Sequence, residues 1–239
     1  MDKKNIAESL RRKLSVYGRD IKPIEEKVLN VDKIYLDDLI WACDQFLKKC
    51  NRYLYRRRGL KKTYDAACEI IENIPYSKKD IEYFCYNGLS EFKSHNYFEE
   101  SGLFISALMN NPRINEKDFS FIFIEANKSI THLGAFSKNT SIELKGNSQN
   151  LNSVGFKARG LRVFSERSIG DYLGDFSINS EYYINGNAGR SLGFFSKKCF
   201  FWVGENVGDC MIQRSKNTII VDGNINSLYG EGKYNIYVG

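Results

Sequence analysis

The C-terminal part of the chain, from Leu133 to Gly239, repeats one pattern of apolar and polar positions about every 18–20 residues. Each repeat begins with a small or apolar residue, carries β-branched and aromatic residues in its middle, and turns on Gly and Asn. The middle runs are residues 141–144, 161–164, 182–184, 200–203 and 218–221. Runs of this length and composition are typical of strands and are too short for helices. A self-similar period of this length predicts a solenoid of stacked coils.

Turns that contain Gly or Asn follow most of these runs, and both residues tolerate positive φ, which suits the corner of a coil. Because one coil cannot bury its apolar positions alone, we expect equivalent side chains of successive coils to stack in ladders. One predicted ladder contains Leu133, Leu151, Leu173, Leu192, Cys210 and Leu228. A second contains Leu144, Ile184, Val203 and Val221. An antiparallel sandwich or barrel with regularly spaced turns is the alternative.

The region before the repeats has the rhythm of amphipathic helices. Apolar residues recur at i, i+3, i+4 and i+7 in residues 36–57, 60–73, 78–93 and 99–110. Gly59 follows a basic last turn, as is usual at a helix C-terminus. Ser77 and Asp80 predict a helix N-cap. A short helix is expected over residues 4–17, and residues 119–125 predict the first strand.

These patterns predict an α+β protein built from two modules, an α-helical domain over residues 1–112 and a β-helix domain over residues 113–239. We expect the helices to cover the N-terminal end of the solenoid, because an open apolar end invites pairing with other strands. The last residues, 234–239, read as a strand with nothing after them to cover it. This predicts a partner at that end, either another copy of the chain or a different protein.

A glycine pattern in residues 184–209 carries a resemblance to a known family. The matching positions are Gly186, Asn187, Gly189, Gly204, Gly208, Asp209 and Gly223. The pattern resembles the GXGXG domain at the C-terminus of the glutamate synthase large subunit, and one of the subunits of formylmethanofuran dehydrogenase is similar to it. The resemblance implies a right-handed, single-stranded β-helix that acts as a structural spacer and carries no catalytic residue. The first two coils lack the second glycine, so the match covers the later coils best.

Composition narrows the class of protein. A chain of 239 residues with 42% hydrophobic and 14% aromatic residues is sufficient for a packed core. No run of about 18 apolar residues and no secretory signal is found, so we expect a cytoplasmic protein without a membrane span. The six cysteines have no CxxC spacing and there are two histidines, so we expect buried free thiols, no metal site and no cofactor.

The net charge of +6 is concentrated near the N-terminus, because residues 1–62 hold 17 Lys and Arg against 9 Asp and Glu. Basic side chains alternate with tyrosines in one segment and form a candidate contact for anions or nucleic acid: Lys48, Lys49, Arg52, Arg56, Arg57, Arg58, Lys61 and Lys62. Lysine and arginine neutralise phosphates, and tyrosine stacks on bases. A solvated basic helix face is the alternative interpretation.

No catalytic constellation is recognisable in the sequence. His132 precedes the first coil and His95 lies in a polar loop, and neither has a recognisable catalytic context. Adjacent carboxylates such as Asp37 and Asp38 diverge by about 100° on a helix and do not converge on one substrate. The glycines of residues 186–193 precede a strand, whereas a phosphate-binding loop precedes a helix.

The sequence therefore predicts a non-enzymatic scaffold or protein-interaction protein, and it is compatible with a subunit of a larger redox or amidotransfer assembly. A nucleic-acid-binding module that uses residues 48–62 is the first alternative. An enzyme with a site between the helices and the β-helix, near His132, is the second.

Overall fold

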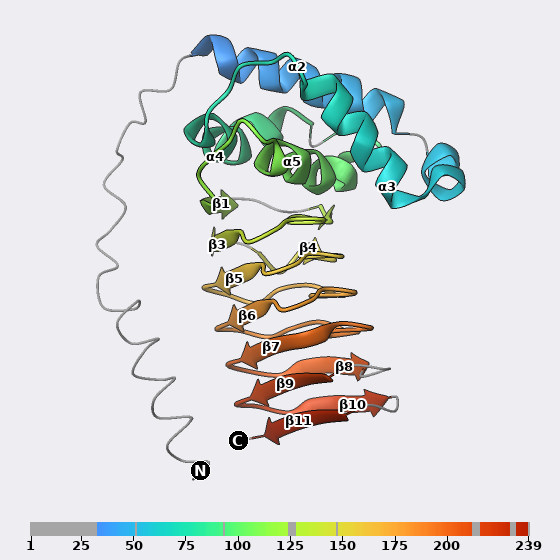
Figure 1. The fold of residues 1–239 in the computed structure, drawn as a ribbon, viewed down its shortest axis with the longest axis vertical. Helices are drawn as coiled ribbons and strands as arrows, with labels where there is room; N and C mark the ends of the chain where they lie inside the picture. Colours follow the sequence, from blue (N-terminus) through green and yellow to red (C-terminus); the bar gives the residue numbers. More distant parts are fainter. Residues whose placement is uncertain are drawn as a thin grey trace. The chain divides into compact units, whose positions relative to one another are not determined.

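The computed structural model of this protein describes residues 33–50, 52–92, 94–123, 128–146, 148–211, 216–229 and 233–238. They belong to one compact unit that spans residues 31–239. In this unit a layer of helices lies against one end of a parallel β-solenoid (Figure 1). The α+β class and the solenoid are therefore confirmed. The helix expected over residues 4–17 lies outside the described residues, and the division into two domains at residue 112 stays a prediction.

The described part of the helical layer contains four α-helices, and two short 3₁₀ segments lie between the third and the fourth. Their bounds are α2 (Lys33–Lys49), α3 (Arg52–Ile71), α4 (Lys78–Tyr86), η1 (Gly88–Phe92), η2 (Phe98–Glu100) and α5 (Ser101–Asn110). The predicted N-cap is present, because the Ser77 amide donates to Asp80 Oδ2 at 2.7 Å and Ser77 Oγ accepts from the Asp80 amide. Among these helices, none combines the length and apolar composition needed to cross a bilayer.

Two predicted helix bounds are wrong. The helix expected over residues 36–57 stops before Cys50, whose amide is shared between the carbonyls of Phe46 and Leu47, and α3 begins at Arg52. This tightened last turn ends α2 although the apolar rhythm continues. The helix expected over residues 78–93 changes to 3₁₀ geometry at Gly88, which packs so closely on Phe84 that an added Cβ would lie 2.5 Å from that ring.

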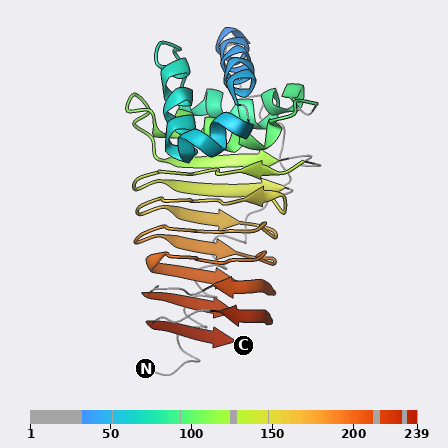
Figure 2. The same ribbon diagram turned by 90° about the vertical axis from the view of Figure 1, so that its right-hand side faces the viewer.

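In the described residues, eleven strands build the solenoid: β1 (Asp118–Phe123), β2 (Ile130–Thr131), β3 (Ser141–Gly146), β4 (Leu151–Asn152), β5 (Arg162–Ser165), β6 (Glu181–Ile184), β7 (Lys197–Val203), β8 (Val207–Met211), β9 (Lys216–Val221), β10 (Ile225–Tyr229) and β11 (Lys233–Val238). Seven of them form one sheet in the order β1-β3-β5-β6-β7-β9-β11, and β2–β4 and β8–β10 form two-stranded sheets. All these pairs are parallel, which excludes the antiparallel sandwich (Figure 2).

The register of the seven-stranded sheet confirms one predicted ladder and corrects the other. Leu144, Ile184, Val203 and Val221 stack, with Ser165 at the same position of the second coil. In the other ladder Leu151 is wrong, because it pairs with Ile130 in the β2–β4 sheet. Val154 takes its place in the ladder. The Val154 carbonyl accepts a hydrogen bond from the Gly174 amide, just as the Leu133 carbonyl accepts one from the Gly155 amide. The first coil is the longer one, because Val154 lies 21 residues after Leu133 and 19 before Leu173, and this length shifts the alignment by three residues.

Helix α5 closes the N-terminal end of the solenoid. Ser106 Oγ donates to the His132 carbonyl at 2.7 Å, and Asn110 Nδ2 donates to the Ala135 carbonyl at 3.0 Å. At Gly102 the helix approaches so closely that a Cβ would overlap the Thr131 carbonyl oxygen. These contacts satisfy main-chain groups of the first coil that no preceding coil can pair, as a cap must. The predicted role of the helices as a cap is confirmed.

Candidate anion-binding groove

Stacking of the coils aligns basic residues of successive coils. They lie at or shortly before the N-terminal end of each strand of the seven-stranded sheet. Lys138 pairs with Arg159, Arg159 with Ile178, and Ile178 with Lys197. The backbone register continues through Lys216 and Lys233. Neighbouring parallel strands lie about 4.8 Å apart. The backbone therefore sets basic residues at five of six consecutive positions of one column, which we call the basic column.

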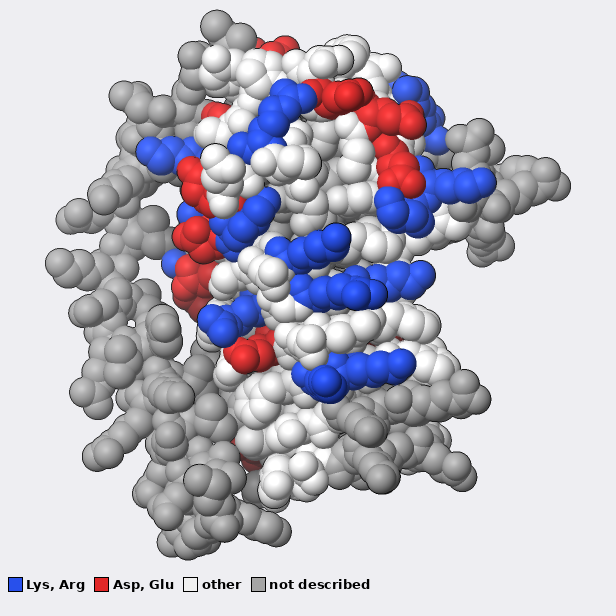
Figure 3. Space-filling view, viewed as in Figure 1, with Lys and Arg blue, Asp and Glu red and all other residues white. Residues whose placement is uncertain are grey.

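A groove with a volume of about 810 Å³ runs beside the upper part of this column. Its lining, taken over the described residues, includes six basic side chains and no carboxylate: Lys61, Lys117, Lys138, Lys157, Arg159 and Lys197. Lys61 comes from α3 and Lys117 from the segment before β1, so the helical cap and the solenoid both contribute. Figure 3 shows a face on which Lys and Arg side chains lie one above another across the coils, with acidic side chains along the left edge and over the helices above.

Two other charged positions on the solenoid differ from the basic column. Arg162 Nε pairs with Glu181 of the next coil at 3.0 Å, and Arg190 pairs with Asp171 at 3.2 Å. Within the described residues no ion pair involves Lys138, Arg159 or Lys197, which are all exposed. At those two positions a cation of one coil meets an anion of the next, whereas these three basic side chains have no such partner among the described residues.

Aromatic rings form the floor of the groove. They follow one another from α3 down the coils with centroid distances of 4.9 Å for Tyr64–Phe136, 6.2 Å for Phe136–Phe156, 5.5 Å for Phe156–Phe176 and 5.3 Å for Phe176–Phe195. Lys157 Nζ lies 5.3 Å from the Phe156 ring centroid and 5.9 Å from that of Phe176, within the range of cation–π attraction. Phe176 is 38% exposed in spite of these contacts.

The same segment has an unusual backbone. Phe136, Lys157, Phe176 and Phe195 occupy equivalent positions of four coils, and their φ angles are 60°, 54°, 56° and 54°. In this left-handed region a residue other than Gly is destabilised by roughly 1–2 kcal/mol. Three of these four strained positions carry a phenylalanine that lines the groove.

Two titratable groups in or next to the groove lining have shifted pKa values, Lys117 in the lining and Asp175, which precedes the lining residue Phe176. Burial lowers the pKa of Lys117, with the carboxylate of Glu116 opposing the shift. Burial raises the pKa of Asp175 to about 8, although Asp175 Oδ1 accepts the Phe194 amide at 3.1 Å, a hydrogen bond that favours the ionised form. Asp175 precedes Phe176 and is 5% exposed. At neutral pH this buried carboxyl group is protonated, so it does not reduce the positive charge of the groove.

Of the basic segment predicted from the sequence, residues 48–62, only one described side chain lines the groove. Lys61 lines the groove, where its ammonium group faces the Tyr64 ring and pairs with Asp65. Lys48, Lys49 and Lys62 are exposed on α2 and α3, and Lys48 pairs with Asp44 at 2.5 Å. The side chains of Arg52, Arg56, Arg57 and Arg58 lie outside the described residues. Their role in nucleic-acid binding stays a prediction.

Three glycines of the predicted pattern, Gly186, Gly204 and Gly223, lie in bends between strands, whereas Gly208 lies in β8. Gly186, Gly204 and Gly223 do not have positive φ. An added Cβ would meet main-chain atoms of the preceding coil at 2.5 Å for Gly186 and Gly204 and at 2.7 Å for Gly223. These glycines, like Gly189 and Gly208, therefore permit close stacking rather than an unusual turn. Asp209 belongs to β8, where it pairs with Ser227.

Asn187 has a function that turn chemistry does not predict. The Asn206 amide donates to Asn187 Oδ1 at 2.9 Å, and the Asn224 amide donates to Asn206 Oδ1 at 3.0 Å. Asn187 in turn donates its amide to Ser168 Oγ at 3.0 Å. Side chains thus satisfy main-chain donors of the next coil along this corner. The site is structural, and it binds coil to coil.

The two histidines lie in different surroundings. His132 is half-buried with its ring edge-on to Phe156, and burial lowers its pKa to about 4. His95 Nδ1 accepts the Tyr97 amide at 3.1 Å beside a hollow near Glu99. The enzyme alternative, which needs titratable groups that converge near His132, stays a prediction.

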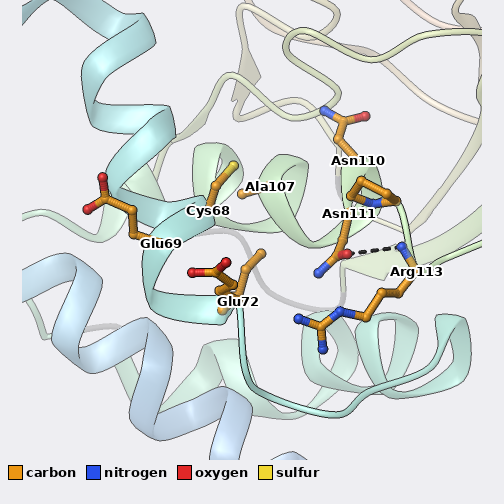
Figure 4. A pocket seen from close by; sticks show the side chains of 9 residues that line it. Cys68, Glu69, Glu72, Ala107, Asn110, Asn111 and Arg113 are labelled. Carbon is orange, nitrogen blue, oxygen red and sulfur yellow. Dashed lines mark hydrogen bonds between the residues drawn. The ribbon is translucent and has the colours of Figure 1, made fainter.

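The cysteines are free thiols in surroundings that favour the protonated form. All six are free, and burial raises the pKa of each thiol, to about 12 for Cys50 and Cys210. Cys68, the most accessible of them, lines a hollow of about 440 Å³ together with Glu72, Asn111 and Arg113 (Figure 4). The described residues that line this hollow include no histidine to activate the thiol. The part of the chain that the structure describes holds no group of three potential metal ligands.

Comparisons with known proteins identify no relative of this chain. No protein-family model matches the sequence, and neither the curated proteins nor the solved structures yield a match. The β-solenoid agrees with the β-helix expectation, but the specific resemblance to the glutamate synthase domain and to a formylmethanofuran dehydrogenase subunit has no support from these comparisons. Function must therefore be inferred from the groove itself.

The carboxyl group of Asp175 predicts a pH-dependent stability. Between pH 4 and the native pKa of about 8, the unfolded chain is ionised at this residue while the folded chain keeps its proton. The free energy of unfolding should therefore fall as pH rises through this window, by on the order of 1 kcal/mol per pH unit, and level off above it. Urea unfolding at pH 5 and pH 8 should show a smaller fall for Asp175→Asn, which keeps the acceptor oxygen. An equal fall in wild type and D175N, with Asp222→Asn as the control, would contradict this prediction.

Proposed function

We propose that this protein is a non-enzymatic binding protein that holds a linear polyanion in the groove beside its basic column. The observation that carries the proposal is the alignment of Lys138, Arg159 and Lys197 in one register position, exposed and without ion pairs among the described residues. The column follows the axis along which the coils stack, so the complementary ligand is an extended chain with repeated negative charge rather than a single small anion.

Stability alone does not explain the basic column. Like charges opposite each other on neighbouring strands are destabilising, and two unit charges about 4 Å apart repel by about 1 kcal/mol even in water. Lys138 and Arg159 are such neighbours, and Ile178 separates Arg159 from Lys197. At two other positions the solenoid places opposite charges on neighbouring coils, Arg162 with Glu181 and Asp171 with Arg190. A polyanion neutralises the column when it binds and releases its own counterions, which favours association.

Charge removal in the groove tests this proposal. We expect the triple variant Lys138→Gln, Arg159→Gln, Lys197→Gln to lose most of the affinity for heparin and for single-stranded oligo(dT), measured by fluorescence anisotropy. If each residue contacts one anionic group, the slope of log K against log salt for oligo(dT) should fall by about 2. All three side chains are exposed, so the fold should be retained.

The matched control removes the same charge from the helical surface, in Lys48→Gln, Lys49→Gln, Lys62→Gln. It should leave both the affinity and the salt slope close to those of wild type. The result that would contradict the proposal is an equal loss in the two triple variants, because binding would then depend only on net charge.

The far end of the solenoid supports a second candidate function, that of a scaffold. Within the described residues β10 and β11 are the last strands of their sheets. Leu228, Tyr229 and Val238 on these strands are 48%, 54% and 56% exposed, although the positions that precede Leu228 and Val238 in the same ladders, Cys210 and Val221, are buried. A further β-strand from another copy or another protein would cover them, as strand addition does at open sheet edges.

The scaffold candidate predicts that the polarity of the last coil controls association. Light scattering should show a larger species for the wild-type chain, and Leu228→Asn with Tyr229→Asn should reduce it to the monomer mass. Leu60→Asn, a half-buried leucine on α3, is the control for a general loss of apolar surface. A wild-type chain that stays monomeric at high concentration would rule out association between copies through this end.

A further inference from the structure

We infer that the polyanion held by the groove is a single-stranded nucleic acid, whose bases stack on the groove phenylalanines while its phosphates contact the basic column. This inference rests on the proposed function and adds the chemistry of the ligand. Lys138, Arg159 and Lys197 attract any polyanion, so the selective features are the rings of Phe136, Phe176 and Phe195 in the same groove.

The position of the rings favours unpaired bases. Phe176 is 38% exposed, and Phe136 and Phe195 are partly exposed beside it. The bases of a duplex are stacked on one another and are not available to rings at the base of a groove, whereas the bases of a single strand can leave the strand and stack on aromatic side chains. A sulfated polysaccharide has no aromatic ring that could stack on the phenylalanines.

Two of the four coils beside the groove place a ring and a basic residue two positions apart. These are Phe136 with Lys138 and Phe195 with Lys197, whereas the coils between them carry Lys157 with Arg159 and Phe176 with Ile178. The first and the last of these coils therefore each offer a ring beside a positive charge. A single strand likewise combines flat bases with charged backbone groups along one direction.

Lysine side chains cover the rings in the absence of a ligand. Lys157 Nζ lies near Phe156 and Phe176, and Lys61 Nζ lies 5.8 Å from the Phe136 ring centroid. Flexible lysine side chains can exchange a ring for a phosphate, since the charge–phosphate contact is the stronger of the two. The movement would expose the ring faces for stacking at the same step.

The left-handed backbone of these positions belongs to the geometry of the coils, because Ser153, Tyr172 and Ser191 outside the groove also have positive φ. What distinguishes the groove is the residue type at these positions. Three of the four carry a phenylalanine, and Phe176 remains 38% exposed.

Three probes separate this inference from the proposed function: oligo(dT) of about 15 nucleotides, the corresponding duplex, and heparin. We expect wild type to bind oligo(dT) more tightly than the duplex at equal salt. The variant Phe176→Leu, Phe195→Leu keeps apolar volume but removes the rings. It should weaken oligo(dT) binding about tenfold and change heparin binding less than about twofold. Phe200→Leu, on the outer face of β7, is the control and should change neither.

Different failures have different meanings. The inference is overturned, and the polyanion proposal survives, if the double variant binds oligo(dT) like wild type, if it loses oligo(dT) and heparin equally, or if the duplex binds as tightly as the single strand. Both are overturned if wild type binds neither oligo(dT) nor heparin at low salt. Thermal unfolding monitored by circular dichroism would show whether the double variant keeps its fold, and Phe176→Tyr, which retains a ring, should then restore oligo(dT) affinity.

Discussion

Main-chain hydrogen bonds between successive coils keep equivalent residues of the solenoid in register, one above the other. The Gly155 amide donates to Leu133, the Gly174 amide to Val154 and the Gly193 amide to Leu173, each at 2.9 Å. Glycines at the corners and in the interior permit this close stacking, because a Cβ at Gly174 would lie 2.8 Å from Phe201 and one at Gly204 would lie 2.5 Å from the Asn185 carbonyl oxygen. Asparagine and serine side chains complete the pairing where main-chain partners diverge.

This register converts spacing along the sequence into columns in space. Interior columns are apolar and bury the core, as in the stack of Ile142, Val163, Tyr182 and Phe201. Exterior columns differ from one another: two of them hold an arginine–carboxylate pair, Arg162 with Glu181 and Arg190 with Asp171, whereas the basic column aligns Lys138, Arg159 and Lys197. A solenoid therefore holds repeated charges at a fixed distance on a rigid support, and the helical cap adds Lys61 and Lys117 at one end. These properties suit a ligand that itself repeats.

The sequence predicted much of this architecture but little of the groove. Strand positions and the ladder from Leu144 to Val221 follow from side-chain type alone, because β-branched and aromatic runs recur at one period. The exchange of Leu151 for Val154 was not predictable by matching leucines, since the longer first coil moves the register. The basic column does not stand out in the distribution of charge along the chain, where residues 48–62 dominate, because its members are about 20 residues apart. A signal existed in the repeats LGAFSK and LGFFSK, which end at Lys138 and Lys197.

Lysine footprinting tests most directly whether the stacked coils present the binding surface. The protein would be acetylated briefly with and without saturating oligo(dT), and in parallel with heparin, and the reactivity of each lysine measured by mass spectrometry. We expect Lys138, Lys157 and Lys197 to become protected together, while Lys48, Lys49 and Lys62 react as before. Protection confined to Lys48, Lys49 and Lys62, or protection of no lysine by either polyanion, would contradict a binding surface on the coils.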